Sequence, residues 1–89
     1  MRRVLVVEDE ESIRELIALN LRMGGYEVLE AASAEQGLAL LGGKRCDAAV
    51  LDVMLPGMNG FSLCEAIRRD DASIGIIILS AKSMEQDKI

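Results

Sequence analysis

Three short apolar runs constrain the fold of this chain more than any other feature. They are Val4–Val7, Ala48–Leu51 and Ile76–Leu79, and none contains a polar residue. Apolar runs of this length, without alternation, are typical of strands buried on both faces, as in a parallel sheet. The stretches between them carry helical apolar spacing and turn residues, so the sequence predicts alternating strands and helices.

Glycines, capping residues and apolar spacing predict the other elements. Three helices are expected: over Ser12–Met23, from the capping box at Ser33–Gln36 to the glycines at 42–43, and from about Gly60 to Arg69. Strands are expected over Tyr26–Ala31 and Gly75–Leu79. Right-handed crossovers then give an α/β fold of the flavodoxin-like class, a doubly wound parallel sheet with strand order 2-1-3-4. The first and third strands are central neighbours in that order, and the mixed polarity of the second suits an edge.

Composition and charge restrict the classes of function. With 89 residues the chain is expected to form one domain, and its 51% apolar content with almost no aromatic residues predicts an aliphatic core. The net charge of −5 argues against direct nucleic-acid binding, and no apolar stretch approaches the roughly 20 residues that span a bilayer. We therefore expect neither nucleic acid nor a membrane as a partner of this segment.

The reactive residue types narrow the chemistry further. Cys46 and Cys64 have neither metal-ligand spacing nor a disulfide-rich context, so both are expected to be free, largely buried thiols of a cytoplasmic protein. The chain has no histidine, which excludes a histidine-based triad and a histidine metal ligand.

Carboxylates follow two of the three apolar runs. Asp52 directly follows the second run, Glu8 and Asp9 follow the first, and the hydroxyl of Ser80 follows the third. Because the carboxyl ends of parallel strands meet at one edge of a sheet, we expect these groups to lie close together. Converging carboxylates repel one another, and Mg²⁺, which prefers oxygen ligands, relieves that repulsion. The pattern points to magnesium-assisted phosphoryl transfer, with a carboxylate as the candidate nucleophile.

Three motifs at these strand ends resemble the receiver domain of bacterial two-component response regulators. They are Val6–Glu10, Val50–Gly60 and Ile78–Lys82, in the order and at the spacing of that family across essentially the whole chain. The resemblance implies that residues 1–89 are a receiver domain. It further implies a signalling module, not an enzyme acting on other substrates, that takes a phosphoryl group from the phosphohistidine of a sensor histidine kinase and switches conformation.

The resemblance also assigns roles by position on the metal side of the site. Asp52 would be the phosphoacceptor and a Mg²⁺ ligand, and Asp9 would bind the metal directly. Glu8 would bind mainly through water, and Met54 would bind through its backbone carbonyl.

On the phosphate side, Ser80 would be the switch hydroxyl, with the backbone N–H of Ala81 assisting. Receiver domains also have a fifth strand ending in a lysine that pairs with the phosphoryl group, an aromatic switch residue on that strand and a fifth helix packed beside the first; this sequence has none of them. Lys82 is a candidate substitute for that lysine, and the alternative is a solvated loop lysine. Since a capping box at Ser83 begins a fourth helix shortly before Ile89, we expect an incomplete receiver that ends at the start of this helix.

Such a chain is expected to leave apolar surface uncovered. The residues concerned are Ile13, Leu16, Ile17 and Leu21 of the first helix, together with the strand at Ile76–Leu79, which would be an open edge. Either the chain is a fragment of a longer regulator, or it associates through that edge as a homodimer or by segment exchange.

Two alternative hypotheses remain open. A truncated or degenerate receiver would keep the fold and act only as a folding or interaction fragment. A haloacid-dehalogenase-type phosphatase also uses an aspartate nucleophile and Mg²⁺. That family places an acid/base aspartate two positions after the nucleophile, where this chain has Met54.

Overall fold

The computed structural model describes residues 2–52, 60–70 and 73–79, in which strands and helices alternate. In chain order the elements are β1 (Arg3–Val7), α1 (Glu11–Met23), β2 (Glu27–Ala31), α2 (Ala34–Gly43), β3 (Ala48–Asp52), α3 (Gly60–Asp70) and β4 (Gly75–Leu79). The elements predicted within these residues are confirmed, with bounds that agree to within one residue. The helix expected from Ser83 lies outside the described residues.

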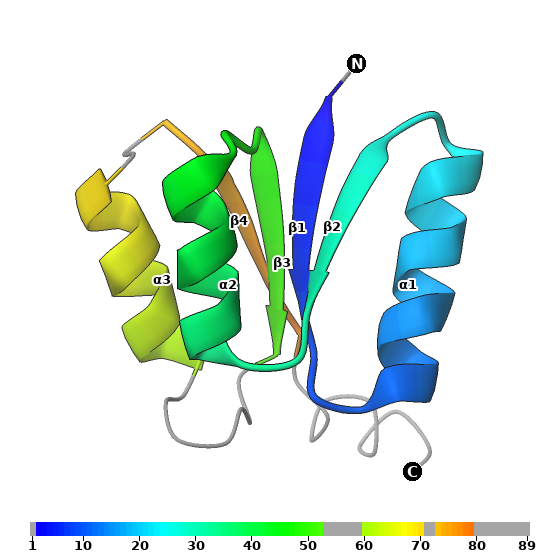
Figure 1. Ribbon diagram of the computed structural model, residues 1–89, viewed down its shortest axis with the longest axis horizontal. Coiled ribbons are helices and arrows are strands. Elements are labelled where there is room, and N and C mark those ends of the chain that lie inside the picture. The colour runs from blue at the N-terminus through cyan, green and yellow to red at the C-terminus, as the bar shows by residue number, and fades with distance from the viewer. Residues whose placement is uncertain (1, 53–59, 71–72, 80–89) are drawn as a thin grey trace, which may run out of the picture.

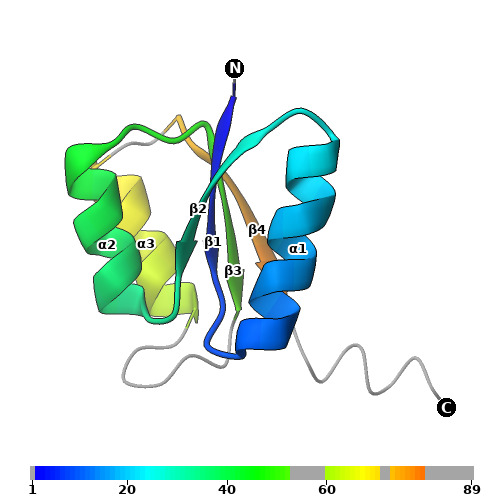
Figure 2. The ribbon, with the colours of Figure 1, turned by 45° about the vertical axis from the view of Figure 1, so that its right-hand side comes forward.

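The four strands form one parallel sheet in the order β2-β1-β3-β4, as predicted. Helix α1 covers one face of this sheet, and α2 and α3 cover the other (Figure 1). The same two helix layers are visible after the molecule is turned (Figure 2). The fold is therefore the doubly wound, flavodoxin-like arrangement that the strand order implied.

Alternate residues of the strands pack into two separate cores. On β1, Leu5 and Val7 face α2 and α3, whereas Val4 and Val6 face α1. The buried residues of the first core are Leu5, Val7, Ala31, Ala34, Cys46, Ala49, Leu51, Leu63, Ile67 and Ile74. Those of the second are Val4, Val6, Ala18, Val28 and Val50. Both cores are aliphatic, as the composition predicted, and each buried Leu, Ile or Val side chain stabilises the fold by about 1.5–3 kcal/mol.

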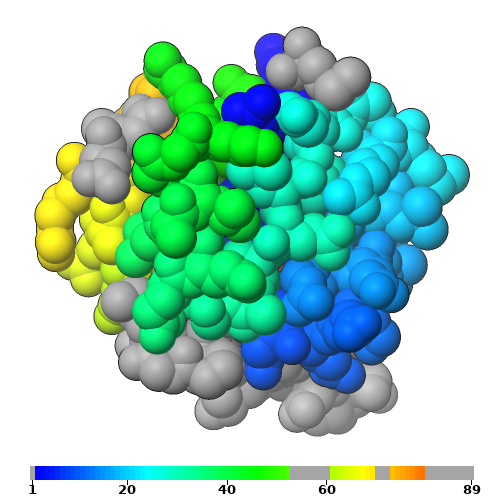
Figure 3. All heavy atoms as spheres, viewed as in Figure 1, coloured from blue at the N-terminus to red at the C-terminus, as the bar shows by residue number. Residues whose placement is uncertain are grey.

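Close packing of α2 on the sheet depends on Gly37. A β-carbon at this position would lie 2.9 Å from Cγ2 of Val7, which is closer than non-bonded carbon atoms approach each other in proteins. The helix therefore comes nearer to β1 here than any larger residue would permit. In the space-filling view, the atoms of α2 lie beside those of the β2 segment, with α1 on the other side of that segment (Figure 3).

Local polar contacts define the helix ends. The Ser33 hydroxyl accepts a hydrogen bond from the Gln36 N–H at 3.2 Å, and the Gln36 side chain accepts one from the Ala32 N–H at 2.7 Å. The capping box is thus present, with its return bond made one residue before the cap. After α1, Gly25 adopts a φ of 93°, a conformation that favours glycine and turns the chain toward β2.

Part of the apolar surface is open, in line with the sequence expectation. Ile17 and Leu21 pack against the core under α1, but Ile13 is exposed and Leu16 is 59% exposed. Ile77 on the edge strand β4 is 56% exposed. Among the described residues, no helix is long and apolar enough to cross a membrane.

Arg3 makes polar contacts that connect the amino ends of neighbouring strands. Its Nε lies 2.7 Å from Oε1 of Glu27, its Nη1 donates to the Arg45 carbonyl at 2.9 Å, and its backbone N–H donates to Oδ2 of Asp47 at 2.8 Å. These contacts join β1 to β2 and to the segment before β3. The carboxyl ends of the strands, at the opposite edge of the sheet, carry a different set of groups.

Candidate phosphoryl-transfer and metal site

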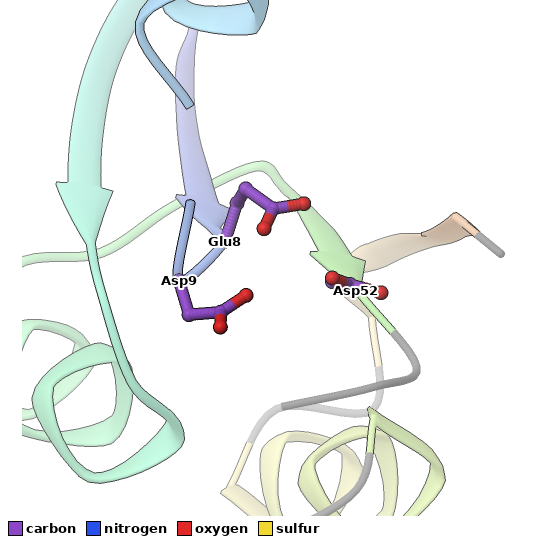
Figure 4. Close-up of side chains that lie close together, drawn as sticks. All are labelled: Glu8, Asp9 and Asp52. Atoms are coloured by element: carbon purple, nitrogen blue, oxygen red, sulfur yellow. The ribbon is translucent and has the colours of Figure 1, made fainter. Parts of the chain in front are cut away.

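Three carboxyl groups converge at the carboxyl ends of the two central strands. Glu8 and Asp9 directly follow β1, and Asp52 is the last residue of β3. Because β1 and β3 pair in parallel, with Val7 opposite Leu51, the next residues leave the sheet side by side. Each of the three side chains offers an oxygen atom, and these atoms all lie within 4.8 Å of one another (Figure 4).

The three groups differ in their exposure to water. Glu8 and Asp52 are buried, with 6% and 8% of their surface exposed, whereas Asp9 is exposed. The cluster therefore has two carboxyl groups set into the protein and one at its rim. A ligand from solvent would reach it from the side of Asp9.

Backbone and side-chain contacts hold Glu8 in place. Its N–H donates to the Ala31 carbonyl on β2 at 3.0 Å, and its Oε2 accepts from the Glu10 N–H at 2.9 Å. Its backbone carbonyl accepts from Nη1 of Arg14 on α1 at 2.8 Å. The turn between β1 and α1 is thus fixed from two neighbouring elements.

Burial raises the pKa of Glu8 from its usual 4.5 to about 7. The hydrogen bond from the Glu10 N–H opposes this change, whereas side-chain hydrogen bonds with Asp9 and Asp52 and repulsion by the Asp52 carboxylate reinforce it. Without a cation, this site therefore takes up a proton near neutral pH. A bound cation favours the ionised form and would release that proton.

The donor set fits Mg²⁺. Carboxylate oxygens are the ligands this ion prefers, and it commonly uses one or two of them together with water and phosphate oxygens. Glu8, Asp9 and Asp52 have the spacing to supply such ligands, with oxygen atoms within 4.8 Å of one another, and Asp9 is the one exposed to solvent. The described part of the cluster contains no histidine or cysteine, the ligands that softer metals favour.

The structure brings together Glu8, Asp9 and Asp52, as the strand order predicted. The other predicted site residues, Met54, Ser80, Ala81 and Lys82, lie outside the described residues, and their roles stay predictions. Cys46 is buried and Cys64 half-buried, and both are free thiols.

Arg14 also contacts the site and is not among the residues predicted from the sequence. A signal for it exists, because Arg14 precedes Ile17, Ala18 and Leu21 by three, four and seven residues and so shares their helix face. A charged residue on the core side of an amphipathic helix requires a polar partner. That partner is the turn that carries the acidic residues.

Comparison with known proteins gives the family of this fold and site. The family model described as "Response regulator receiver domain" matches residues 4–89. Among curated proteins, the chain is 40% identical over 91 residues to the DNA-binding dual master transcriptional regulator RpaA of Synechocystis, covering 100% of this chain and 38% of that protein. It is 42% identical over 90 residues to the phosphate regulon transcriptional regulatory protein PhoB of Pseudomonas aeruginosa, covering 99% of this chain and 39% of PhoB. The chain thus spans about two fifths of the length of these relatives.

Solved structures agree. The response regulator TrrA of Thermotoga maritima, in complex with Mg²⁺-BeF, matches with a TM-score of 0.88 and 35% identity, covering 100% of this chain and 77% of that one. A structure of the histidine kinase ThkA in complex with TrrA matches with a TM-score of 0.85 and 37% identity, covering 91% of this chain and 70% of the matched one.

Proposed function

The chain belongs to the response regulator receiver domain family, and from that premise we propose that Asp52 is the phosphoacceptor of a two-component phosphorelay. The observation that supports this most directly is the position of Asp52. It is buried at the carboxyl end of a central strand, and an oxygen atom of its carboxylate lies within 4.8 Å of oxygen atoms of Glu8 and Asp9. An isolated surface aspartate would have neither this burial nor these neighbours.

The partner we propose is a sensor histidine kinase, as in the complex of TrrA with ThkA. A carboxylate oxygen of Asp52 attacks the phosphorus of the kinase phosphohistidine, and the bond from phosphorus to the imidazole nitrogen breaks. The electron pair of that bond returns to the imidazole, which then takes a proton. The product is an aspartyl phosphate on this chain.

We propose Mg²⁺ as the cofactor, with Asp9 and Asp52 as direct ligands, Glu8 acting through water and Met54 contributing its backbone carbonyl. When bound, the ion offsets the charge of the carboxylates and of the phosphoryl oxygens. The complex of TrrA with Mg²⁺-BeF supports this assignment, because TrrA matches this chain over all of its 89 residues.

The conformational switch is proposed for residues after β4. Ser80 would bond a phosphate oxygen, the N–H of Ala81 would assist, and Lys82 is the candidate cation facing the phosphate. These residues directly follow Leu79, which pairs with Asp52 across β3 and β4. That register supports their placement near the acceptor.

The domain proposed here is residues 1–89, and we place its activity in the cytoplasm. The free thiols of Cys46 and Cys64 are consistent with a reducing compartment. The match to the receiver family over residues 4–89 argues against the alternative of a haloacid-dehalogenase-type phosphatase.

Mass spectrometry after incubation with acetyl phosphate and Mg²⁺ tests the proposal. We expect a gain of one phosphoryl group that is stable in acid and lost in base. Asp52→Asn should show no gain, whereas Asp47→Asn, at the opposite end of the same strand region, should label like the wild type. If the wild type is not labelled under conditions that label another receiver, the chain is an inert or interaction fragment instead.

A further inference from the structure

One guanidinium group ties three elements together next to the acidic cluster. Arg14 lies on α1 with only 16% of its side chain exposed. Its Nη1 donates to the backbone carbonyl of Glu8 at 2.8 Å, and its Nε lies 3.6 Å from Oε1 of Glu30 on β2. The group thus spans α1, β2 and the turn after β1.

The bond to Glu8 restricts the residue that follows it. The Glu8 carbonyl and the Asp9 N–H belong to the same planar peptide unit. The hydrogen bond to the carbonyl oxygen therefore restricts the orientation of this peptide plane and, with it, the direction in which the backbone enters Asp9. Asp9 is the exposed member of the acidic cluster. The Glu8 N–H and side chain are held separately by Ala31 and Glu10, so Arg14 holds the one backbone group of Glu8 that those contacts leave.

Arg14 has no role as a ligand, because a guanidinium offers donors and no acceptor. We infer that Arg14 is a positioning residue for the metal site, which orients the Glu8–Asp9 peptide so that both carboxylates reach a cation together with Asp52. This inference rests on the proposed function, because it takes the cluster to be the Mg²⁺ site. Removing a group that hydrogen-bonds to a metal ligand commonly lowers the metal affinity by about 10- to 100-fold.

The chain contains a matched control in Arg22. It also lies on α1 and also pairs with Glu30, at 3.1 Å from Oε2. Its other hydrogen bond goes to the Val28 carbonyl of β2, at 3.4 Å. Substitution of either arginine therefore removes an ion pair with Glu30, but only substitution of Arg14 removes the bond to Glu8.

The test is a Mg²⁺ titration by calorimetry of the wild type, Arg14→Gln and Arg22→Gln, at the same ionic strength. We expect the dissociation constant to rise about 10-fold in Arg14→Gln and to stay within roughly twofold in Arg22→Gln. Thermal unfolding of the metal-free proteins, measured in parallel, separates a loss of affinity from a loss of fold. Equal affinities in the two variants would overturn the inference.

Lysine variants keep the test decisive if Arg14→Gln does not fold. Arg14→Lys retains the charge, but its single nitrogen cannot reproduce the two-nitrogen contact with Glu8 and Glu30. We expect its affinity to fall below that of Arg22→Lys, and an affinity equal to that of Arg22→Lys would contradict the positioning role. A wild type that does not bind Mg²⁺ would overturn the proposed metal site itself, which is a different result from equal binding by all variants.

Discussion

The carboxyl groups of Glu8 and Asp52 face each other across the ends of the two central strands, β1 and β3, with an oxygen atom of each within 4.8 Å of the other. Both groups are buried, so a proton held on Glu8 reduces the repulsion that a cation would otherwise relieve. Proton and metal therefore compete for the same oxygens. This competition makes both the stability of the fold and its affinity for a cation depend on pH.

Stability of the metal-free protein should fall as the pH rises from about 4.5 to about 7. In that interval Glu8 is ionised in the unfolded chain but protonated in the folded one, so folding takes up a proton and is weakened as protons become scarce. The change amounts to at most about 3 kcal/mol, and the contribution is constant below and above the interval. Urea unfolding in a chelator at a series of pH values measures it. Glu8→Gln should lose this part of the pH dependence, and an unchanged profile in that variant would exclude Glu8 as its source.

Mg²⁺ should stabilise the folded protein, and more strongly above pH 7 than below it. The ion requires ionised carboxylates, and Glu8 gives up its proton only near pH 7. At a free concentration 100 times the dissociation constant, the gain is about 2.7 kcal/mol. Thermal unfolding with and without MgCl₂, at matched ionic strength, measures this gain. Asp9→Asn should reduce it sharply; a gain of the same size in that variant would show that the ion binds elsewhere.

Gly37→Ala should be less stable than Gly42→Ala by about 1–3 kcal/mol, because the added methyl would lie 2.9 Å from Cγ2 of Val7 and force α2 away from the sheet. Gly42→Ala is the matched control on the same helix. A β-carbon there meets no atom within 4 Å, and alanine is the better helix former by about 1 kcal/mol. The propensity gain applies to both variants, so chemical unfolding should show Gly37→Ala to be the less stable one, and equal stability of the two would argue against the close approach at Gly37.

The exposed edge of the sheet should promote self-association. Ile77 is 56% exposed on β4, the edge strand of the described sheet, and a second chain could pair there as a homodimer or by segment exchange. Sedimentation should show a mass that rises with concentration, and Ile77→Lys should reduce this rise. Leu19→Lys, at a residue 55% exposed on α1, is the matched control and should leave it unchanged. A wild type that stays monomeric at all concentrations would refute the association.

The parts of the fold that depend on local signals were predictable from the sequence. The capping residue Ser33, the glycine with positive φ at position 25 and the apolar runs each act on their own neighbours, so their positions define the elements. The convergence of Glu8 and Asp52 was also predictable, because the crossover rule gives the strand order and the strand order gives the shared edge.

Features that depend on tertiary distance were not predictable in this way. The bond from Arg14 to the Glu8 carbonyl requires the orientation of α1 over β1 and β2. The close approach at Gly37 requires the height of α2 above the sheet, and the raised pKa of Glu8 requires the depth at which it is buried. Residue spacing alone predicts neither the orientation of α1, nor the height of α2, nor the depth of Glu8.

The parallel sheet also separates two ends of the molecule that can change independently. The carboxyl and amino ends of the parallel strands lie at opposite edges of the sheet (Figure 1). The acidic cluster occupies the carboxyl ends, and the contacts of Arg3 with Glu27 and Asp47 connect the amino ends. The turn at 24–26 and the segment at 44–47 belong to the second end, and their exposed residues lie away from the chemistry. A reporter group, an affinity label or an evolutionary insertion placed there would alter what surrounds the protein while its reactive end stays intact.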